Sequence, residues 1–232
     1  MNREATNRIR FVLEDVLPPV LRDSRLFHAL ARLAWGKHVT RLAAFRARAP
    51  FLSPEEYEAL YRDHPRVHEG TDNSRACVER IIADTVGSSV CDVGCGTGLL
   101  LRMLRDRKGP LKRLTGVDFV IDDAAGIDGV DYVAARIEQL PFADKAFDTV
   151  ICTHVIEHVL DYREAIAELR RIAAKRLIIV VPREREYRYS FNPHFNFFPY
   201  AHSFLRAVHP SPEIFVCDDI GRDIYYCEDR PD

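Results

Sequence analysis

Two histidines and a glutamate stand close together after a short apolar run, at His154, Glu157 and His158. Their spacing of three and four residues predicts that the side chains share one face of a helical turn. An imidazole titrates near neutral pH, so His154 is the first candidate for a general base, with His158 beside it. In the alternative interpretation, His154 only lines a pocket and His158 caps the following helix.

The same side chains are also a chelating set for a divalent ion, with His194 as a fourth ligand. We expect that no metal ion is required, because the chemistry inferred below does not depend on one. A metal site at His154, Glu157, His158 and His194 is therefore a secondary hypothesis.

A short apolar strand, predicted over Ser89–Val93, runs into a glycine turn at Gly94–Gly98 (GCGTG) and then into an apolar helix. The three glycines allow a tight turn and let a ligand approach the main chain. A strand, a glycine turn and a helix N-terminus form a nucleotide-binding element, although the G-x-G-x-G spacing departs from the dinucleotide pattern. Asp92 would repel a pyrophosphate, and it suits a ligand with a cationic ammonium and sulfonium. That ligand is S-adenosylmethionine.

Strands alternate with helices from Ser89 onward. Five short apolar runs predict parallel strands, at Val90–Val93, Leu114–Val117, Tyr132–Ala135, Thr149–Cys152 and Leu177–Val181. A helix is predicted over residues 161–174, and only a helical stub over Ile121–Val130. Ile214–Cys217 and Ile224–Cys227 flank a Gly221-Arg222 turn and predict a hairpin. We expect a doubly wound, seven-stranded Rossmann-like α/β sheet whose last strand is antiparallel.

Four motifs occur in a fixed order along this region. They are Asp92–Gly98, Gly116-Val117-Asp118, Arg136–Phe142 (RIEQLPF) and Phe147–Cys152 followed by Thr153–Val159 (THVIEHV). Through these motifs the chain from about Ser74 to Glu228 resembles class I S-adenosylmethionine-dependent methyltransferases, of the small-molecule type with L-P-F, F-D and E-H segments. The resemblance implies cofactor contacts at Asp92, Gly94, Cys95, Gly96, Asp118, Phe119, Arg136, Ile137 and Thr153.

In that family the acid at the Asp118 position holds both ribose hydroxyls, and the next residue, here Phe119, packs on the adenine. The chain departs from the family at Arg136, where an aspartate commonly accepts from the adenine amino group. Arginine only donates hydrogen bonds, so it cannot replace that contact, but the backbone amide of Ile137 can still serve the adenine ring.

The segment from His154 to His158 is similar to the E-x-x-E-H pattern of ubiquinone-pathway O-methyltransferases and small-RNA 2′-O-methyltransferases, in which carboxylates and histidines bind a metal. His154 stands where that pattern has its first glutamate. A metal-assisted nucleic-acid 2′-O-methyltransferase is therefore one alternative function. The formal net charge of −2 counts against a nucleic-acid partner.

Aromatic residues are concentrated between Tyr187 and Phe204, where the family inserts acceptor-binding structure. We expect an acceptor-binding insertion over about 183–212. Its pocket residues are His194, Phe198 and His202, and the acceptor is a small aromatic or apolar molecule. In the alternative interpretation, the aromatic residues pack in the core.

Residues 1–80 predict a helical cap or lid, and residues 81–232 the methyltransferase domain. Helices are predicted over residues 9–17 and 24–35, and Ser53 is a predicted N-cap. Tyr57 and Tyr61 are candidates to close over the cofactor. Basic residues occur among apolar ones at Arg32, Lys37, His38, Arg41, Arg46 and Arg48. Residues 25–48 therefore predict either a solvated basic face of the cap or a peripheral contact with a membrane surface or anionic partner.

The six cysteines show no C-x-x-C pair, and the N-terminus lacks the apolar core of a signal peptide. No apolar run approaches a transmembrane span, so we expect a cytoplasmic enzyme. Together these features predict transfer of a methyl group from S-adenosylmethionine to oxygen or nitrogen of a small molecule. A non-catalytic, cofactor-binding scaffold of the same fold is the alternative from a different class. The identity of the acceptor and the oligomeric state stay open at this point.

Overall fold

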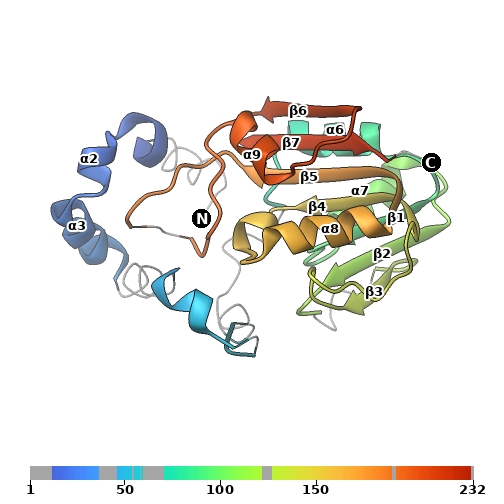
Figure 1. Ribbon diagram of the computed structural model, residues 1–232, viewed down its shortest axis with the longest axis horizontal. Helices are drawn as coiled ribbons and strands as arrows, with labels where there is room; N and C mark the ends of the chain where they lie inside the picture. The colour runs from blue at the N-terminus through green and yellow to red at the C-terminus, as the bar shows by residue number, and fades with distance from the viewer. Residues whose placement is uncertain are drawn as a thin grey trace.

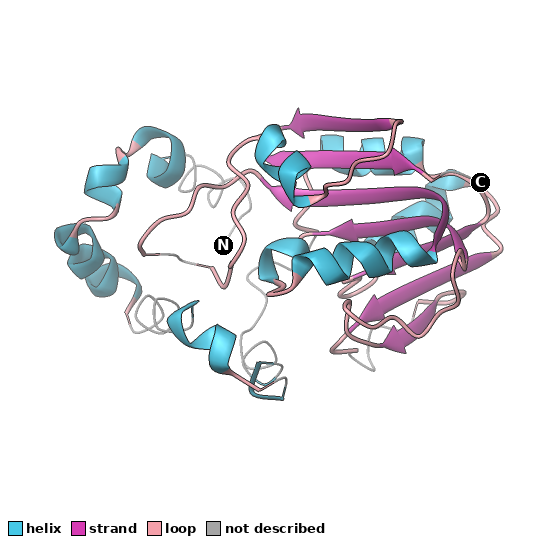
Figure 2. Ribbon diagram, viewed as in Figure 1, coloured by secondary structure: helices cyan, strands magenta, loops and turns pink. Residues whose placement is uncertain are grey.

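Seven strands form a single sheet in the order β3-β2-β1-β4-β5-β7-β6 (labelled in Figure 1 and drawn in magenta in Figure 2). The structure is a computed structural model, and it describes residues 12–36, 46–53, 55–57, 59, 71–121, 127–189 and 192–230. The strands are β1 (Ser89–Val93), β2 (Arg113–Asp118), β3 (Asp131–Ala134), β4 (Phe147–Thr153), β5 (Ala173–Pro182), β6 (Phe215–Ile220) and β7 (Asp223–Asp229). The first five pair in parallel, and β7 pairs antiparallel with both β5 and β6. The predicted fold class is confirmed.

Helices cover both faces of the sheet (Figure 1). Helices α6 (Arg75–Asp84) and α7 (Leu99–Lys108) lie behind it in this view, and α8 (Tyr162–Ile172) and α9 (Ala201–Ala207) lie in front. Two buried clusters of apolar side chains fill the space between the layers, one on each face. The expected domain boundary at residues 80–81 falls inside α6, whose buried side chains join the cluster behind the sheet.

The helix predicted over residues 161–174 ends two residues early. It begins after Asp161, whose side chain accepts a hydrogen bond from the Glu164 amide at 3.2 Å. Ala173 and Ala174 belong to β5 instead, and Ala173 pairs with Phe147 of β4. Alanine favours a helix by intrinsic propensity, but pairing with a buried neighbouring strand outweighs that small preference.

The N-terminal segment is helical and lies at one end of the molecule (Figure 1). It contains η1 (Val12–Val16), α2 (Pro19–Arg22), α3 (Arg25–Trp35) and η2 (Ala49–Phe51). Ser24 caps α3 by accepting from the Phe27 amide at 3.0 Å. Ser53 and Glu56 form the reciprocal bonds of a capping box, so the predicted cap at Ser53 is present.

Some expectations fall on residues outside the described ranges. These are Ile9, Lys37, His38, Arg41, Tyr61 and residues 122–126 of the expected stub. On the far side of that stub, residues 127–130 form a turn. No helix within the described ranges is long and apolar enough to cross a membrane.

Polar and aromatic contacts hold the N-terminal segment against the loop that follows β5. The Arg46 guanidinium donates to the Tyr187 carbonyl at 2.7 Å and to the Glu186 carboxylate at 2.6 Å. The Asp23 carboxylate accepts from the Arg188 amide at 2.6 Å. These contacts place the N-terminal segment beside the carboxyl ends of the parallel strands.

A buried ion pair joins the front helix layer to the sheet and yields a testable prediction. The Arg170 guanidinium donates to the Glu228 carboxylate at 2.7 and 2.9 Å, and Glu228 is completely buried. Replacing Arg170 by Leu would remove the main partner of a buried charge, so we expect the free energy of unfolding to fall by about 3–5 kcal/mol in urea titrations. Arg163→Leu, at an exposed position of the same helix, is the control and should change it by less than about 0.5 kcal/mol. Equal effects of the two substitutions would contradict the role given to this ion pair.

Candidate active site

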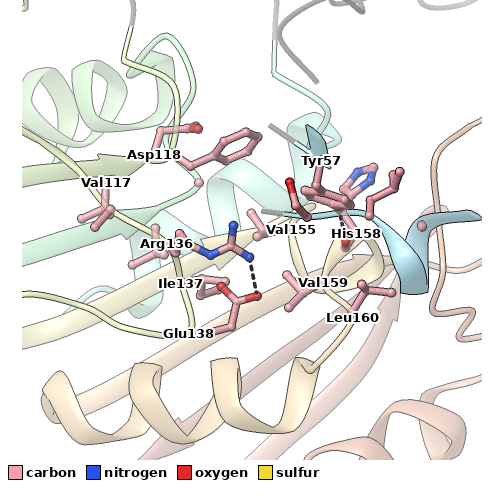
Figure 3. A pocket seen from close by; sticks show the side chains of 17 residues that line it. Tyr57, Val117, Asp118, Arg136, Ile137, Glu138, Val155, His158, Val159 and Leu160 are labelled. Carbon is pink, nitrogen blue, oxygen red and sulfur yellow. Dashed lines mark hydrogen bonds and ion pairs between the residues drawn. The ribbon is translucent and has the colours of Figure 1, made fainter. Parts of the chain in front are cut away.

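A cavity of about 270 Å³ lies at the carboxyl ends of β1, β2 and β3 (Figure 3). Ligands of doubly wound sheets bind at this end of the strands. Six of the residues predicted for the site line the cavity, namely Gly94, Asp118, Phe119, Arg136, Ile137 and His158. The sequence pattern therefore identified one continuous surface from segments that are far apart in the chain.

The glycine turn after β1 is fastened to the end of β2. The amides of Gly94 and Cys95 both donate to the Val117 carbonyl, at 2.7 and 3.0 Å. The Gly96 amide donates to the Asp118 carboxylate at 2.9 Å, and the Val120 amide is 3.3 Å from its other oxygen. These bonds hold the Asp118 carboxylate at the cavity wall, where it can accept hydrogen bonds from a sugar.

Asp92 directly precedes Val93 and Gly94, two residues that line the cavity. It is only 2% exposed, and burial, with the nearby charge of Asp118, raises the pKa of its carboxyl to about 7. Its Oδ1 atom has no hydrogen-bond partner among the described residues. A buried carboxyl group beside a cavity, with one oxygen that accepts no hydrogen bond from the described residues, fits a ligand that carries a positive charge. The residues present therefore fit S-adenosylmethionine, whose sulfonium and ammonium are cationic.

Another part of the cavity wall is formed by the segments that follow β2 and β3. Phe119 and Ile137 line it, and Arg136 extends beside Glu138 with 3.5 Å between guanidinium nitrogen and carboxylate oxygen (Figure 3). Arg136 thus lies within the cavity wall. Glu138 supplies an acceptor close to the position where the family aspartate is missing.

His154 differs from the helical position expected for it. Its φ is +56°, in the left-handed region that non-glycine residues seldom occupy, and its amide donates to the Val180 carbonyl at 2.9 Å. The helical turn η4 (Ile156–His158) begins only after it, so the predicted single helical face is wrong for this residue. Burial favours the neutral ring, but the Glu157 carboxylate and the charge of Asp223 outweigh it and raise the pKa of His154. His154 therefore holds its proton more tightly than an ordinary histidine.

His158 lines the cavity and has the opposite electrostatic character. Burial and the neighbouring His194 lower the pKa of its imidazole to about 4. Its Nδ1 atom lies 3.2 Å from the Pro193 carbonyl oxygen, which assigns the ring proton to Nδ1 and leaves Nε2 as an acceptor. Of the two predicted bases, His158 is the one with a neutral ring at the cavity.

Glu157 is the buried centre of the histidine cluster. Its carboxylate oxygen is 3.6 Å from His154 Nδ1 and 3.9 Å from His158 Nε2. Burial opposes ionisation of this carboxyl group, but the close contact with His154 outweighs burial and lowers the pKa of Glu157. Glu157, His158 and His194 each offer one atom that could bind a metal ion, and these three atoms lie within 4.8 Å of one another. His154 does not belong to this triplet.

The insertion after β5 is pinned to the same turn. The amides of Phe195 and Asn196 donate to the Glu157 carbonyl at 2.7 and 3.1 Å. The Asn196 side chain donates to the carbonyls of Ile156 and Val159 at 2.8 and 2.6 Å. The His194 imidazole contacts the Glu184 carboxylate at 2.7 Å, so His194 is held rigidly next to His158.

The remaining predicted site residues lie outside the cavity wall. Thr153 accepts from the Asn73 side chain at 3.0 Å, and Cys95 is buried behind the loop. Phe198 packs in the core against Phe204 and borders a separate open groove between α8 and α9. His202 is exposed on α9 and stacks on Tyr200. His194, Phe198 and His202 are not among the residues that line the strand-end cavity, and the expectation that these three form an acceptor pocket stays a prediction.

Sequence reasoning missed one wall of the cavity almost entirely. Ala49, Leu52 and Ser53 come from the N-terminal segment, and Val155, Val159 and Leu160 surround η4. Tyr57, one of the two suggested lid residues, also lines the cavity, and its hydroxyl donates to the His158 carbonyl. Ala49, Leu52 and Leu160 lie outside the four motifs, and the suggested lid residue Tyr57 was the sequence signal that pointed to this wall.

A sequence model of the family described as methyltransferase domain matches residues 91–181. This segment is similar to methyltransferase domains. It runs from β1 into β5 and includes the glycine turn, Asp118, His154 and His158, whereas His194 lies beyond it. A SAM-dependent methyltransferase from Thermotoga maritima, titled a possible histamine N-methyltransferase, shares the fold with a TM-score of 0.53 and 18% identity. That similarity covers 67% of this chain and 88% of the other.

Two curated relatives match over different lengths. An uncharacterised 37.1 kDa protein in transposon Tn4556 of Streptomyces fradiae is 28% identical over 71% of this chain and 57% of its own length. The demethylmenaquinone methyltransferase of Staphylococcus aureus is 32% identical over 37% of this chain and 39% of its own length. The chain thus spans well under two thirds of either relative.

Gly94 offers a direct test of the close packing at the cavity. Its φ is +80°, and an added Cβ would lie 2.1 Å from Val155 Cγ2. We expect Gly94→Ala to lower the free energy of unfolding by about 2–5 kcal/mol, because it adds backbone strain and overpacking. The same substitution should abolish binding of S-adenosylhomocysteine, the demethylated product of the cofactor, in calorimetry. Gly129 has the same φ with nothing within 4 Å, so Gly129→Ala should cost only about 1–2 kcal/mol and leave binding intact. Unchanged binding in Gly94→Ala would refute this account of the turn.

Proposed function

We propose that the protein transfers a methyl group from S-adenosylmethionine to an oxygen or nitrogen atom of a small, partly apolar or aromatic metabolite. The observation that carries this proposal is the cavity at the strand ends, whose wall combines Gly94, Asp118 and Ile137 with an uncharged imidazole at His158. When bound, the cofactor supplies a methyl group on a sulfonium that is already an activated leaving group. The protein then has to position the two reactants and manage one proton.

Each part of the cofactor is proposed to contact particular residues in or next to the cavity wall. Asp118 accepts hydrogen bonds from the ribose hydroxyls, and its carboxylate is oriented for this by the Gly96 amide. Phe119 packs against the adenine, and the Ile137 amide serves its ring. The Glu138 carboxylate, next to Arg136, accepts from the adenine amino group in place of the missing aspartate. Asp92 stabilises the cationic end, since a positive charge there favours its ionised form.

His158 is proposed to accept the proton of the attacking nucleophile. It borders the cavity beside Val155 and Val159, and its Nε2 atom carries the lone pair. His154 is proposed as a positioning residue, because it holds Glu157 and does not border the cavity. This division replaces the expectation that His154 is the first candidate for the base.

The apolar part of the cavity supports a partly apolar acceptor. Leu52, Val159 and Leu160 border it, and Tyr57 closes it from the N-terminal side. The Staphylococcus relative matches over 37% of this chain and is named a demethylmenaquinone methyltransferase, a name that indicates a quinone acceptor. Apolar walls with few polar groups are typical of small-molecule sites.

Transfer can be tested with S-adenosylmethionine carrying a tritiated methyl group in a size-fractionated extract of the cells that produce the protein. We expect label in the small-molecule fraction, because the cavity is narrow and apolar. Asp118→Asn is the matched control, since loss of the charged acceptor should weaken binding of S-adenosylhomocysteine about ten- to hundredfold in calorimetry and reduce labelling. Label in RNA would favour the nucleic-acid alternative. Tight binding without labelling of any fraction would favour a non-catalytic scaffold.

Metal-assisted transfer is a second candidate function, favoured by the environment of the histidine cluster. Glu157, His158 and His194 present donor atoms within 4.8 Å of one another. The Nδ1 atoms of His158 and His194 are engaged by the Pro193 carbonyl and the Glu184 carboxylate. Metal-binding histidines usually donate their second ring N–H to such oxygens, which leaves Nε2 for the ion. Two imidazoles and a carboxylate suit Zn²⁺ or a similar transition metal.

Titration calorimetry with Zn²⁺ separates this candidate from the proton-acceptor role of His158. If the cluster binds metal, the protein takes up one equivalent, and Glu184→Gln weakens that binding about ten- to hundredfold because it loosens His194. His202→Ala, at an exposed histidine outside the cluster, is the control and should leave Zn²⁺ affinity unchanged. Absence of Zn²⁺ binding, with labelling activity unaffected by chelator, would remove the metal candidate and retain His158 as the proton acceptor.

A further inference from the structure

Helix α3 (Arg25–Trp35) has two chemically different sides, and only one of them is used by the fold. Its inner side is packed: Ala31 is buried, and the His28 ring stacks on Tyr189 with 4.1 Å between centroids. Next to it, the Arg22 guanidinium lies 4.5 Å from the centre of the Phe27 ring. The helix is therefore a docked element with a defined orientation.

The outer side of α3 carries a stripe of leucines that the fold leaves in solvent. Leu26 is 71% exposed, Leu30 57% and Leu33 86%. Positions 26, 30 and 33 fall on one line along a helix. Val20 and Leu21 of the preceding α2 (Pro19–Arg22) are also exposed, at 78% and 53%. A cap that only covered the domain would bury its leucines, so this side is suited to an apolar surface outside the chain.

The charge pattern identifies the kind of surface. From Ser24 to Pro54 the sequence has six lysines and arginines and no aspartate or glutamate, in a chain whose net charge is −2. Arg25 and Arg32 are both exposed and lie seven residues apart, so they flank the leucine stripe along one edge. Long arginine side chains at such an edge can keep their charge among lipid headgroups while the leucines enter the acyl region.

The position of the helix allows a flat surface to reach it. In Figure 1, α2 and α3 lie at the end of the molecule, on the side away from the sheet. We propose that the outer face of α2 and α3 (Val20, Leu21, Leu26, Leu30 and Leu33, flanked by Arg25 and Arg32) binds the surface of an anionic phospholipid bilayer. This surface would hold the loop at residues 187–189, and with it the neighbouring cavity, close to the membrane.

Sedimentation of the full chain with lipid vesicles tests this proposal. We expect binding to vesicles of phosphatidylcholine and phosphatidylglycerol, weaker binding to phosphatidylcholine alone, and loss of binding at high salt. The double substitution Arg25→Gln/Arg32→Gln should reduce partitioning to the anionic vesicles about 25-fold, since each basic residue contributes about fivefold. Binding that is equal on the two kinds of vesicle would overturn the proposal.

The leucine stripe is tested separately from the charges. Leu30→Glu/Leu33→Glu should reduce partitioning by at least about tenfold, because it removes the inserted apolar surface. Ile214→Glu, at a residue 67% exposed beside strand β6, is the matched control and should bind vesicles like the unaltered chain. Circular dichroism and S-adenosylhomocysteine binding should be the same in all variants. If the leucine variant instead binds vesicles normally, or dissociates an oligomer of the unaltered chain in lipid-free light scattering, the face belongs to a protein interface or to none.

Discussion

The carbonyl oxygen of Val117 accepts hydrogen bonds from two successive amides, those of Gly94 and Cys95, and the active-site cavity depends on this junction. The turn after β1 can only reach the end of β2 because Gly94 adopts a left-handed φ and leaves no Cβ against Val155. The same closure brings the Gly96 amide to the Asp118 carboxylate. One backbone contact thus sets the wall on which a ribose would lie and the direction of the acid that would hold it.

A second constraint is the burial of the Glu157 carboxylate. A buried charge is costly unless other groups compensate for it. His154 compensates it from one side, since its contact with Glu157 raises the pKa of the imidazole, and this contact gives a reason for a non-glycine residue at φ +56°. On the other side, the Phe195 and Asn196 amides bind the Glu157 carbonyl. The insertion after β5 is therefore fixed to the turn that carries His158. Glu157 thus contacts His154 through its carboxylate and the insertion through its backbone carbonyl.

The sequence predicted those parts of the fold that local patterns determine. Apolar runs marked all the parallel strands, and the glycine spacing with Asp118 marked one end of the cavity. The other wall was not predictable in this way, because the contact between Tyr57 and His158 spans about a hundred positions and involves a side chain without a motif. The different positions of Phe198 in the core and His202 at the surface were also not predictable, because an aromatic-rich run does not reveal which of its residues face the core and which face solvent.

The N-terminal segment is attached to the loop that follows β5. Arg22 is almost fully buried, and its guanidinium lies between the rings of Phe27 and Tyr187. Stacking on two rings offsets part of the cost of burying this cation, so the contact resists separation of α3 from the loop after β5. That loop continues into the residues that hold Glu157 and His158. A displacement of α3 would therefore also move the part of the cavity wall that contains His158. The junction between Gly94 and Val117 would stay in place.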